Sequence, residues 1–369
     1  MSENYNMKKI LYITTDSWWD TDVTIIPQLA TEYEMEVFVA SETDIKKNKY
    51  AIKEVPQGVI LHDVHFVKTQ YNPLMLFTSL VYLVKLLIAL PRADYVFWVV
   101  DSMVYYSIPF SFCCNKNRTI ISYHNYEVHP GTSSFTGLQQ KLFLRLFTLF
   151  HFHSEKQEAI FKKDFPEKKS FSTRMPVKYL GQPSKTNKLF DNHKRTFLFL
   201  GMIRYYKRPD LFINAAFLNQ DNANFILAGK ADERNEILKL TRNSKMYLKL
   251  DFLSNDDMAY FMSQADFLVL PYDHTTQSGP LLIAYAYNKP IIATRLDYFS
   301  EMVKDKETGF LFNPGSQSEL NDIISYCSAM PSTEYEKMVK AVKNQTMTYI
   351  LQSNFSSALT TFLNSETLR

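Results

Sequence analysis

The sequence predicts an α/β fold with two doubly wound domains whose parallel sheets face a cleft. Strand-like and helix-like runs alternate in both halves of the chain, which is typical of parallel sheets with helices on both faces. A polar stretch, Gly181–Arg195, interrupts the alternation and is the best linker candidate. The length of 369 residues also suits two domains, since one domain takes ~150 residues.

The expected boundaries follow from this linker. We expect a first domain at residues 1–183, a linker at 184–195, a second domain at 196–345 and a C-terminal helix at 346–369 that packs back toward the first domain. In sheets of this kind, ligands bind outside the carboxyl ends of the strands.

The composition is that of a folded globular protein, with 46% hydrophobic and 15% aromatic residues. The formal net charge of +3 is too small to argue for nucleic acid, and no nucleic-acid-binding motif is present. Cys113, Cys114 and Cys327 form a poor disulfide framework, so we expect reduced thiols in a cytosolic protein. The apolar run ILYITT near the N-terminus is too short for the core of a signal peptide and is expected to form the first strand.

The elements of the first domain are predicted from their apolar patterns. The expected strands are Ile10–Thr15, Glu36–Ala40, Tyr95–Val100 and Thr119–Tyr123, and the expected helices are Leu74–Leu90 and Gly137–Phe150.

The second domain repeats the alternation. The expected strands are Phe197–Ile203, Asn224–Ala228, Lys245–Phe252, Phe267–Leu270 and Pro290–Thr294, and the expected helices are Arg208–Phe217, Asp256–Gln264, Asn321–Cys327, Glu334–Lys343 and Thr348–Asn364.

Two segments of the first domain raise the question of membrane contact. Leu74–Leu90 is apolar apart from Lys85 and a few hydroxyls, but it is shorter than the ~20 residues that span a bilayer. It is either a helix of the first domain or a monotopic membrane contact. Further on, Phe143, Leu144, Leu146, Phe147, Phe150 and Phe152 lie among the basic residues Lys141, Arg145, Lys156, Lys162, Lys163, Lys168, Lys169 and Arg174. That pattern fits either a core helix with a solvated face or a helix that rests on anionic lipid. We therefore expect a cytoplasmic protein, and the second alternative would place it at the inner face of the membrane.

A polar loop at Thr275–Gly279 joins a strand to a helix and predicts a phosphate site. Pro280 suits the first turn of the helix, and Ser278 or Gly279 suits the cap before it. The free N–H groups and positive dipole of a helix N-terminus hold anions. We therefore expect Thr276, Gln277, Ser278, Gly279 and Pro280 to bind substrate, although no carboxylate occurs between Asp273 and Asp297.

Gly201 ends the run FLFLG within another predicted strand and is followed by two cations. Glycine lets the backbone turn tightly and lets a ligand approach closely. Arg204 and Lys207 come next in the loop, where they suit a diphosphate or simply form a solvated basic surface.

From Thr196 to Pro314 the order of these features resembles the nucleotide-binding half of a GT-B glycosyltransferase of the large family-four group. GMIRYYKRPD, NFILAGK, QADFLVLPY and TQSGPLLIAYAYNKPIIAT are similar to that family's successive strands and donor loops, and YFSEMVKDKETGFLFNPGS resembles its closing turn and glycine-containing hairpin. The resemblance implies two Rossmann-like domains, with the donor on the second and the acceptor on the first.

The resemblance also implies roles for individual residues. Lys207 matches the lysine that contacts the donor diphosphate, and Arg204 is given the same role. In ISYHNYEVHPG, His124 is expected to bond the donor sugar, Asn125 stands where the family has aspartate, and Glu127 is a candidate acceptor base. We assign His124, Arg204 and Lys207 as catalytic, and Gly201, Asn125 and Glu127 as substrate-binding together with the Thr276–Pro280 loop.

One departure concerns acids. Many members of the family carry a Glu-x7-Glu pair, and the matching positions here hold Thr275 and Ile283. Neither side chain can act as a carboxylate would, so the stereochemical outcome stays open.

Metal binding is not expected. Asp20–Thr21–Asp22 forms a DxD motif, which follows the Trp18–Trp19 pair. We interpret this segment as a capping, solvated loop or as a loop that contacts the acceptor. His124 and His129 lack the supporting spacing of a metal site. We expect no cofactor, with the nucleotide-sugar donor as a substrate.

The leading hypothesis is transfer of a sugar from a nucleoside-diphosphate sugar to a glycan or lipid-linked acceptor in surface polysaccharide synthesis. The family favours a retaining, metal-independent reaction with electrostatic stabilisation of the leaving group. Two alternatives remain: a non-hydrolysing sugar-nucleotide epimerase, and a sugar-nucleotide-binding partner protein without activity. The acid-free loop argues against the first and motivates the second.

Overall fold

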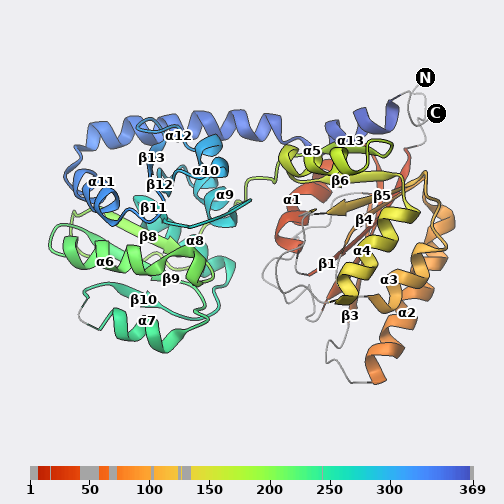
Figure 1. Cartoon of the computed structure of the whole chain (residues 1–369), viewed down its shortest axis with the longest axis horizontal. Helices are drawn as coiled ribbons and strands as arrows, with labels where there is room; N and C mark the ends of the chain where they lie inside the picture. Colours follow the sequence, from red (N-terminus) through yellow and green to blue (C-terminus); the bar gives the residue numbers. More distant parts are fainter. Residues whose placement is uncertain are drawn as a thin grey trace. The chain divides into compact units, whose positions relative to one another are not determined.

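Figure 1 shows the computed structural model of the protein, which describes residues 7–16, 18–41, 58–65, 73–100, 104–123, 126, 134–242 and 244–365. The chain divides into two compact units. Met1–Pro176 and Gln352–Arg369 form the first unit, and Val177–Leu351 forms the second.

The first unit is built on a parallel sheet with the strand order β3-β2-β1-β4-β5-β6-β7. The order reverses beside β1, so the switch point lies between β1 and β4. The strands are β1 (Lys9–Thr15), β2 (Glu34–Ser41), β3 (Val59–His65), β4 (Tyr95–Val99), β5 (Thr119–Tyr123), β6 (Leu149–Phe152) and β7 (Lys169–Ser172).

Helices cover both faces of this sheet because successive strand residues point to opposite sides. Leu11 and Ile13 of β1 pack in one core with α2, α3 and α4, whereas Ile10 and Tyr12 pack in another with α1 and α13. The helices are α1 (Trp19–Leu29), α2 (Pro73–Ala89), the short η1 (Leu90–Arg92), α3 (Val104–Ser111), α4 (Ser134–Leu146), α5 (Glu155–Asp164) and α13 (Phe355–Asn364).

The second unit holds another parallel sheet, with the order β10-β9-β8-β11-β12-β13. Its strands are β8 (Thr196–Leu200), β9 (Asn224–Ala228), β10 (Tyr247–Lys249), β11 (Phe267–Leu270), β12 (Ile291–Thr294) and β13 (Gly309–Phe312). Its helices are η2 (Tyr205–Lys207), α6 (Pro209–Asn219), α7 (Arg234–Leu240), α8 (Asn255–Gln264), α9 (Gly279–Ala286), α10 (Asp297–Met302), α11 (Gln317–Ala329) and α12 (Ser332–Gln352).

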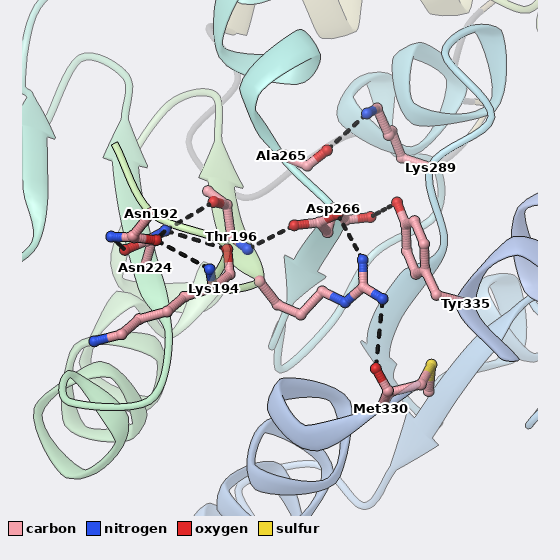
Figure 2. Close-up of polar contacts among 10 residues, drawn as sticks. Asn192, Lys194, Thr196, Asn224, Ala265, Asp266, Lys289, Met330 and Tyr335 are labelled. Carbon is pink, nitrogen blue, oxygen red and sulfur yellow. Dashed lines mark hydrogen bonds and ion pairs between the residues drawn. The ribbon is translucent and has the colours of Figure 1, made fainter. Parts of the chain in front are cut away.

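A polar cluster fixes the amino-terminal edge of this second sheet (Figure 2). The Asp266 carboxylate, just before β11, accepts hydrogen bonds from the Thr196 N–H of β8 at 2.8 Å and from Arg195 at 3.3 Å. Arg195 also lies over the Tyr335 ring, 4.1 Å from its centroid. These contacts join the starts of β8 and β11 and leave the opposite, carboxyl edge for binding.

The predicted fold class is confirmed, since both units are α/β with parallel sheets. The expected linker, 184–195, lies within the second unit. There Ser184 donates its hydroxyl and its N–H to Asp256, and the Leu189 N–H donates to Gln264 at 3.0 Å. The polarity of this stretch reflects these contacts with α8.

Three predicted elements differ from the structure. The helix expected at Gly137–Phe150 ends at Leu146, because Leu149–Phe152 is a buried strand of the sheet. The glycine-containing hairpin expected within YFSEMVKDKETGFLFNPGS does not form, because β13 in this segment pairs in parallel with β12. The helix expected at Thr348–Asn364 is divided near Asn354, whose side chain caps α13 by accepting the Ser357 N–H.

Candidate functional site

The predicted phosphate-binding residues meet at the carboxyl edge of the second sheet. Gly201 directly follows β8, and the loop at residues 271–278 follows β11. These two strands are neighbours at the point where the strand order reverses. In doubly wound sheets this is the usual position of a ligand.

Gly201 lies against both other parts of the predicted site. Its φ of 106° belongs to the region that favours glycine. A Cβ at this position would lie 3.3 Å from Pro280 Cγ and 3.8 Å from Lys207 Nζ. The structure therefore brings Gly201, Lys207 and the start of α9 together.

Gly229, at the end of β9, is a second backbone constraint that the sequence analysis did not single out. A Cβ here would come within 1.8 Å of the Gly201 carbonyl oxygen, and its φ is 150°. The exits of β8 and β9 thus pass so closely that only glycine fits. In the sequence, this constraint is indicated by the position of Gly229 in Ala-Gly-Lys, directly after an apolar run.

Lys207 is a buried cation at the centre of this group. Only 9% of its surface is exposed, and its Nζ lies 5.2 Å from the centroid of the Tyr272 ring and 6.0 Å from that of Tyr206. Burial, and then the positive charge of Arg204, lower the pKa of Lys207 to about 8, while Asp232 acts in the opposite direction. Among the described residues, none forms a hydrogen bond or an ion pair with Nζ, so an anionic ligand would supply its missing partner.

Arg204 is more exposed than Lys207. Its Nε lies 3.2 Å from the Asp232 carboxylate, and about half of its side chain is open to solvent. A bridge between Ile203 and Ala231 holds the two loops together at this point. Arg204 therefore sits at the same edge as Lys207, with part of its charge balanced by Asp232.

The loop after β11 is tied to η2 by several contacts. The Asp273 N–H donates to the Tyr206 carbonyl at 2.8 Å, and Arg208 contacts Asp273 at 3.2 Å and Asp210 at 2.8 Å. His274 stacks on Tyr206 with ring centroids 4.8 Å apart. These contacts hold the loops after β8 and β11 in one arrangement.

The start of α9 has the predicted cap. The Ser278 hydroxyl is buried and accepts the Leu281 N–H at 3.4 Å, with Gly279 and Pro280 in the first turn. Thr275 donates to the Gln277 carbonyl at 2.6 Å, and Thr276 is exposed. A Cβ on Gly279 would meet no atom within 4 Å, so the described structure leaves open space beside the helix start.

No acid stands at the positions where the family pattern has a Glu pair. Ile283 is buried in α9, and Thr275 forms the loop contact given above. The nearest carboxylate in sequence, Asp273, is held by Arg208. Tyr272, to which no role is assigned from the sequence, buries its hydroxyl near Ser278, and this burial raises the pKa of Tyr272.

The predicted residues of the first unit have different outcomes. His124, Asn125 and Glu127 lie outside the described residues.

Asp20–Thr21–Asp22 lies in the first turn of α1, which begins at Trp19, so the expectation of a capping, solvated loop is wrong for this segment. Asp22 is buried and accepts a 2.7 Å hydrogen bond from Tyr12, and Trp19 is fully buried. In the described part of the chain, no group of three or more His, Cys, Asp or Glu could hold a metal ion.

Comparison with known proteins supports the resemblance. Residues 194–329 match the family model described as glycosyl transferases group 1. The 2-deoxystreptamine N-acetyl-D-glucosaminyltransferase of Niallia circulans is 27% identical over 135 residues, a match that covers 35% of this chain and 35% of that relative. The shared stretch thus spans about a third of the relative's length.

Solved structures share the fold across both units. A glycosyltransferase from Rickettsia africae ESF-5 superposes with a TM-score of 0.71 at 14% identity, covering 98% of this chain and 100% of the other. Anabaena HepE, solved with UDP and glucose, gives a TM-score of 0.66 at 16% identity and covers 96% and 99%. The expected GT-B resemblance is confirmed: the chain has the GT-B fold, and its residues 194–329 match the family model of the group 1 glycosyl transferases.

Proposed function

We propose that the protein transfers a sugar from a nucleoside-diphosphate sugar to a hydroxyl of a glycan or lipid-linked acceptor. The observation that carries this proposal is the buried ammonium of Lys207 beside Gly201 and the start of α9, which has no hydrogen-bond or ion-pair partner among the described residues. A buried cation without a partner is costly, and a diphosphate supplies both charge and acceptors. Anabaena HepE, which has the same fold, was solved with UDP and glucose.

The chemistry follows from the charge that develops on the leaving group. The bond between the anomeric carbon and the diphosphate oxygen breaks and a new bond forms to the acceptor oxygen. The acceptor hydroxyl gives its proton to a base, for which Glu127 is our candidate. Lys207, Arg204 and the N–H groups at the start of α9 stabilise the negative charge on the departing diphosphate. These groups provide the stabilisation without a metal ion in our proposal.

The finer parts of the proposal come from the sequence resemblance. We propose a retaining reaction in surface polysaccharide synthesis, with His124 bonding the donor sugar, and Asn125 and Glu127 near the acceptor. Gln277 and Thr276 would line the sugar side of the donor. The lack of a carboxylate at Thr275 and Ile283 makes the stereochemistry a separate experimental question.

A second candidate is a sugar-nucleotide-binding protein without transfer activity. The observation that favours it is the same lack of a loop carboxylate, with Asp273 engaged by Arg208. An epimerase has less support, because the described donor loop offers no acid or base pair around a sugar.

One experiment separates these functions. The purified protein is incubated with a panel of UDP-, GDP-, ADP- and dTDP-sugars, with and without a mixture of glycan and lipid-linked acceptors, and nucleotide release and sugar products are measured. Our proposal predicts nucleotide release that depends on the acceptor. An epimerised sugar nucleotide from donor alone would contradict it, as would donor binding without release for every acceptor.

A further inference from the structure

Two neighbouring helices of the first unit, α2 and α3, expose several large apolar side chains. On α2, Phe77, Leu80, Val84 and Ile88 are between 47% and 62% exposed. Tyr105 of α3 and Phe112, directly after α3, are 50% and 65% exposed. α3 contacts α2 on one side and α4 on the other (Figure 1). We call the outward side of these helices the α2–α4 surface.

The pattern of α2 separates its two sides clearly. Ser79, Tyr82, Leu86 and Ala89 are buried against the sheet at helical spacing. The exposed positions of this 17-residue helix between residues 76 and 88, which an ordinary surface helix fills with polar residues, are apolar apart from Lys85. Such a helix is ~26 Å long, so the exposed stripe is long as well. Single exposed apolar residues need no explanation, but a contiguous group marks an interaction site.

The aromatic residues that first suggested lipid contact are not part of this surface. Phe143, Phe147, Phe150 and Phe152 are all buried in the core beneath α2, α3 and α4. The exposed apolar residues lie instead on α2, the other segment that raised the question of membrane contact.

The charge of the α2–α4 surface has one sign. The helices α2, α3 and α4 and the segment 112–118 contain no aspartate or glutamate. Their exposed charged residues are Lys85, Lys116, Arg118, Lys141 and Arg145. None of the five forms an ion pair with a carboxylate in the described ranges. By contrast, Lys162 of α5 is paired with Glu158 at 2.7 Å.

We propose that the α2–α4 surface docks on an anionic lipid bilayer. Apolar side chains of a surface-lying helix enter the boundary of the acyl chains, while flanking lysine and arginine bind acidic headgroups. A second copy of the chain suits the surface poorly, because a two-fold contact would place each basic group opposite its own kind. None of the helices in the described ranges is long and apolar enough to cross a membrane.

Docking of this kind does not depend on the proposed transfer reaction, since it needs neither donor nor acceptor. The test therefore uses the full chain without substrates. The protein is sedimented with vesicles of phosphatidylcholine alone or of equal parts phosphatidylcholine and phosphatidylglycerol, at low and high salt. We expect strong binding to the anionic vesicles, weak binding to the neutral ones and a loss of binding at high salt.

Two pairs of variants locate the contact. Phe77→Glu with Ile88→Glu should lower the partition coefficient roughly ten-fold or more, because it places charge in the apolar stripe. Its matched control is Phe217→Glu with Leu218→Glu, which changes two exposed residues of α6 in the second unit. Lys141→Gln with Arg145→Gln should lower binding to anionic vesicles about ten-fold, and Lys337→Gln with Lys340→Gln on α12 is the control with the same charge change.

The expected result is that each α2–α4 variant loses vesicle binding while its control keeps it. Three results would overturn the proposal: no binding to anionic vesicles, equal loss in the α6 controls, or a dimer in solution that the Phe77 and Ile88 changes dissociate. All of these residues are exposed, so folding of the variants is checked by circular dichroism and is expected to be unchanged.

Discussion

At the residue scale, the buried charge of Lys207 affects both the stability of the protein and the function that we propose. Its ammonium is buried without a carboxylate partner in the described ranges, and burial lowers its pKa. A residue of this kind costs stability in the absence of ligand and gains a partner when an anion binds. This explains why a charged side chain stands where an apolar one would pack more easily.

Replacing Lys207 with methionine should therefore stabilise the ligand-free protein. The charge is removed and the apolar stem is kept, so we expect the free energy of unfolding at pH 7 to rise by roughly 1–3 kcal/mol. Urea denaturation measures the change, with Lys340→Met on the exposed surface of α12 as the control. The gain should shrink as the pH rises from 8 toward 10.5, because the unfolded state then binds more protons than the folded state and wild-type stability increases. A loss of stability on Lys207→Met would contradict our interpretation.

The same pKa predicts the pH dependence of activity. Burial lowers the pKa of Lys207 to about 8, so in our proposal the amine that forms above this pH would no longer stabilise the leaving diphosphate. We expect kcat/KM to fall above that pH, and the fall to move to higher pH in Lys207→Arg, since arginine stays charged. A profile that is flat to pH 10 in the wild type would refute this role.

At the element scale, glycines at the strand ends shape the site. Gly201 and Gly229 stand where β8 and β9 leave the sheet in close contact, while Gly279 begins α9 beside open space. The three positions form a natural series of alanine substitutions that differ in the room available.

We expect stability to fall most in Gly229→Ala, less in Gly201→Ala and little in Gly279→Ala. The first forces a Cβ into the Gly201 carbonyl and should cost several kcal/mol, and the second is strained by its positive φ at about 1–3 kcal/mol. Thermal unfolding gives the order. Gly279→Ala should still weaken nucleotide binding, because its methyl group would occupy the space that we assign to the donor. Unchanged nucleotide affinity in a stable Gly279→Ala protein would place the donor elsewhere.

The elements that could be predicted from the sequence are those with a strong local pattern. Apolar runs bounded by Gly or Pro, such as the runs of β8 and β11, and the Ser278 cap of α9 are visible in the sequence itself. Gly229 and Tyr272 could not be assigned, because their importance comes from the parallel pairing of β8 with β9 and from the burial of Lys207. The extra strand after α4 was missed because its apolar run continues that of the helix, and only tertiary packing separates them.

At the scale of the whole molecule, the C-terminal residues return to the first unit. α13 packs its apolar side against α1, where Gln28 accepts the Phe355 N–H at 3.0 Å and Tyr33 bonds Thr360 at 2.7 Å. The two residues in each of these contacts are 327 positions apart in the sequence. Residues from the end of the chain therefore complete the first unit. Its stability should depend on this helix.

A pair of leucines tests that dependence. Leu359 of α13 is fully buried, whereas Leu351 near the end of α12 is 80% exposed. We expect Leu359→Ala to lower stability by about 2–4 kcal/mol and Leu351→Ala to change it by less than about 0.5 kcal/mol. Calorimetry should assign the Leu359 effect to the unfolding transition of the first unit. Equal effects of the two substitutions would mean that α13 contributes no core packing.

The central claim is that Lys207 holds the diphosphate of a nucleotide-sugar donor at the carboxyl edge of the second sheet. Calorimetric titration of the wild type, Lys207→Met and Lys340→Met with UDP, GDP, ADP and dTDP tests it most directly. We predict that at least one nucleotide binds the wild type and Lys340→Met equally, and binds Lys207→Met at least ~10-fold more weakly, since a charged hydrogen bond is worth about 1.5–3 kcal/mol. Equal affinity of a well-folded Lys207→Met protein for that nucleotide would contradict the claim.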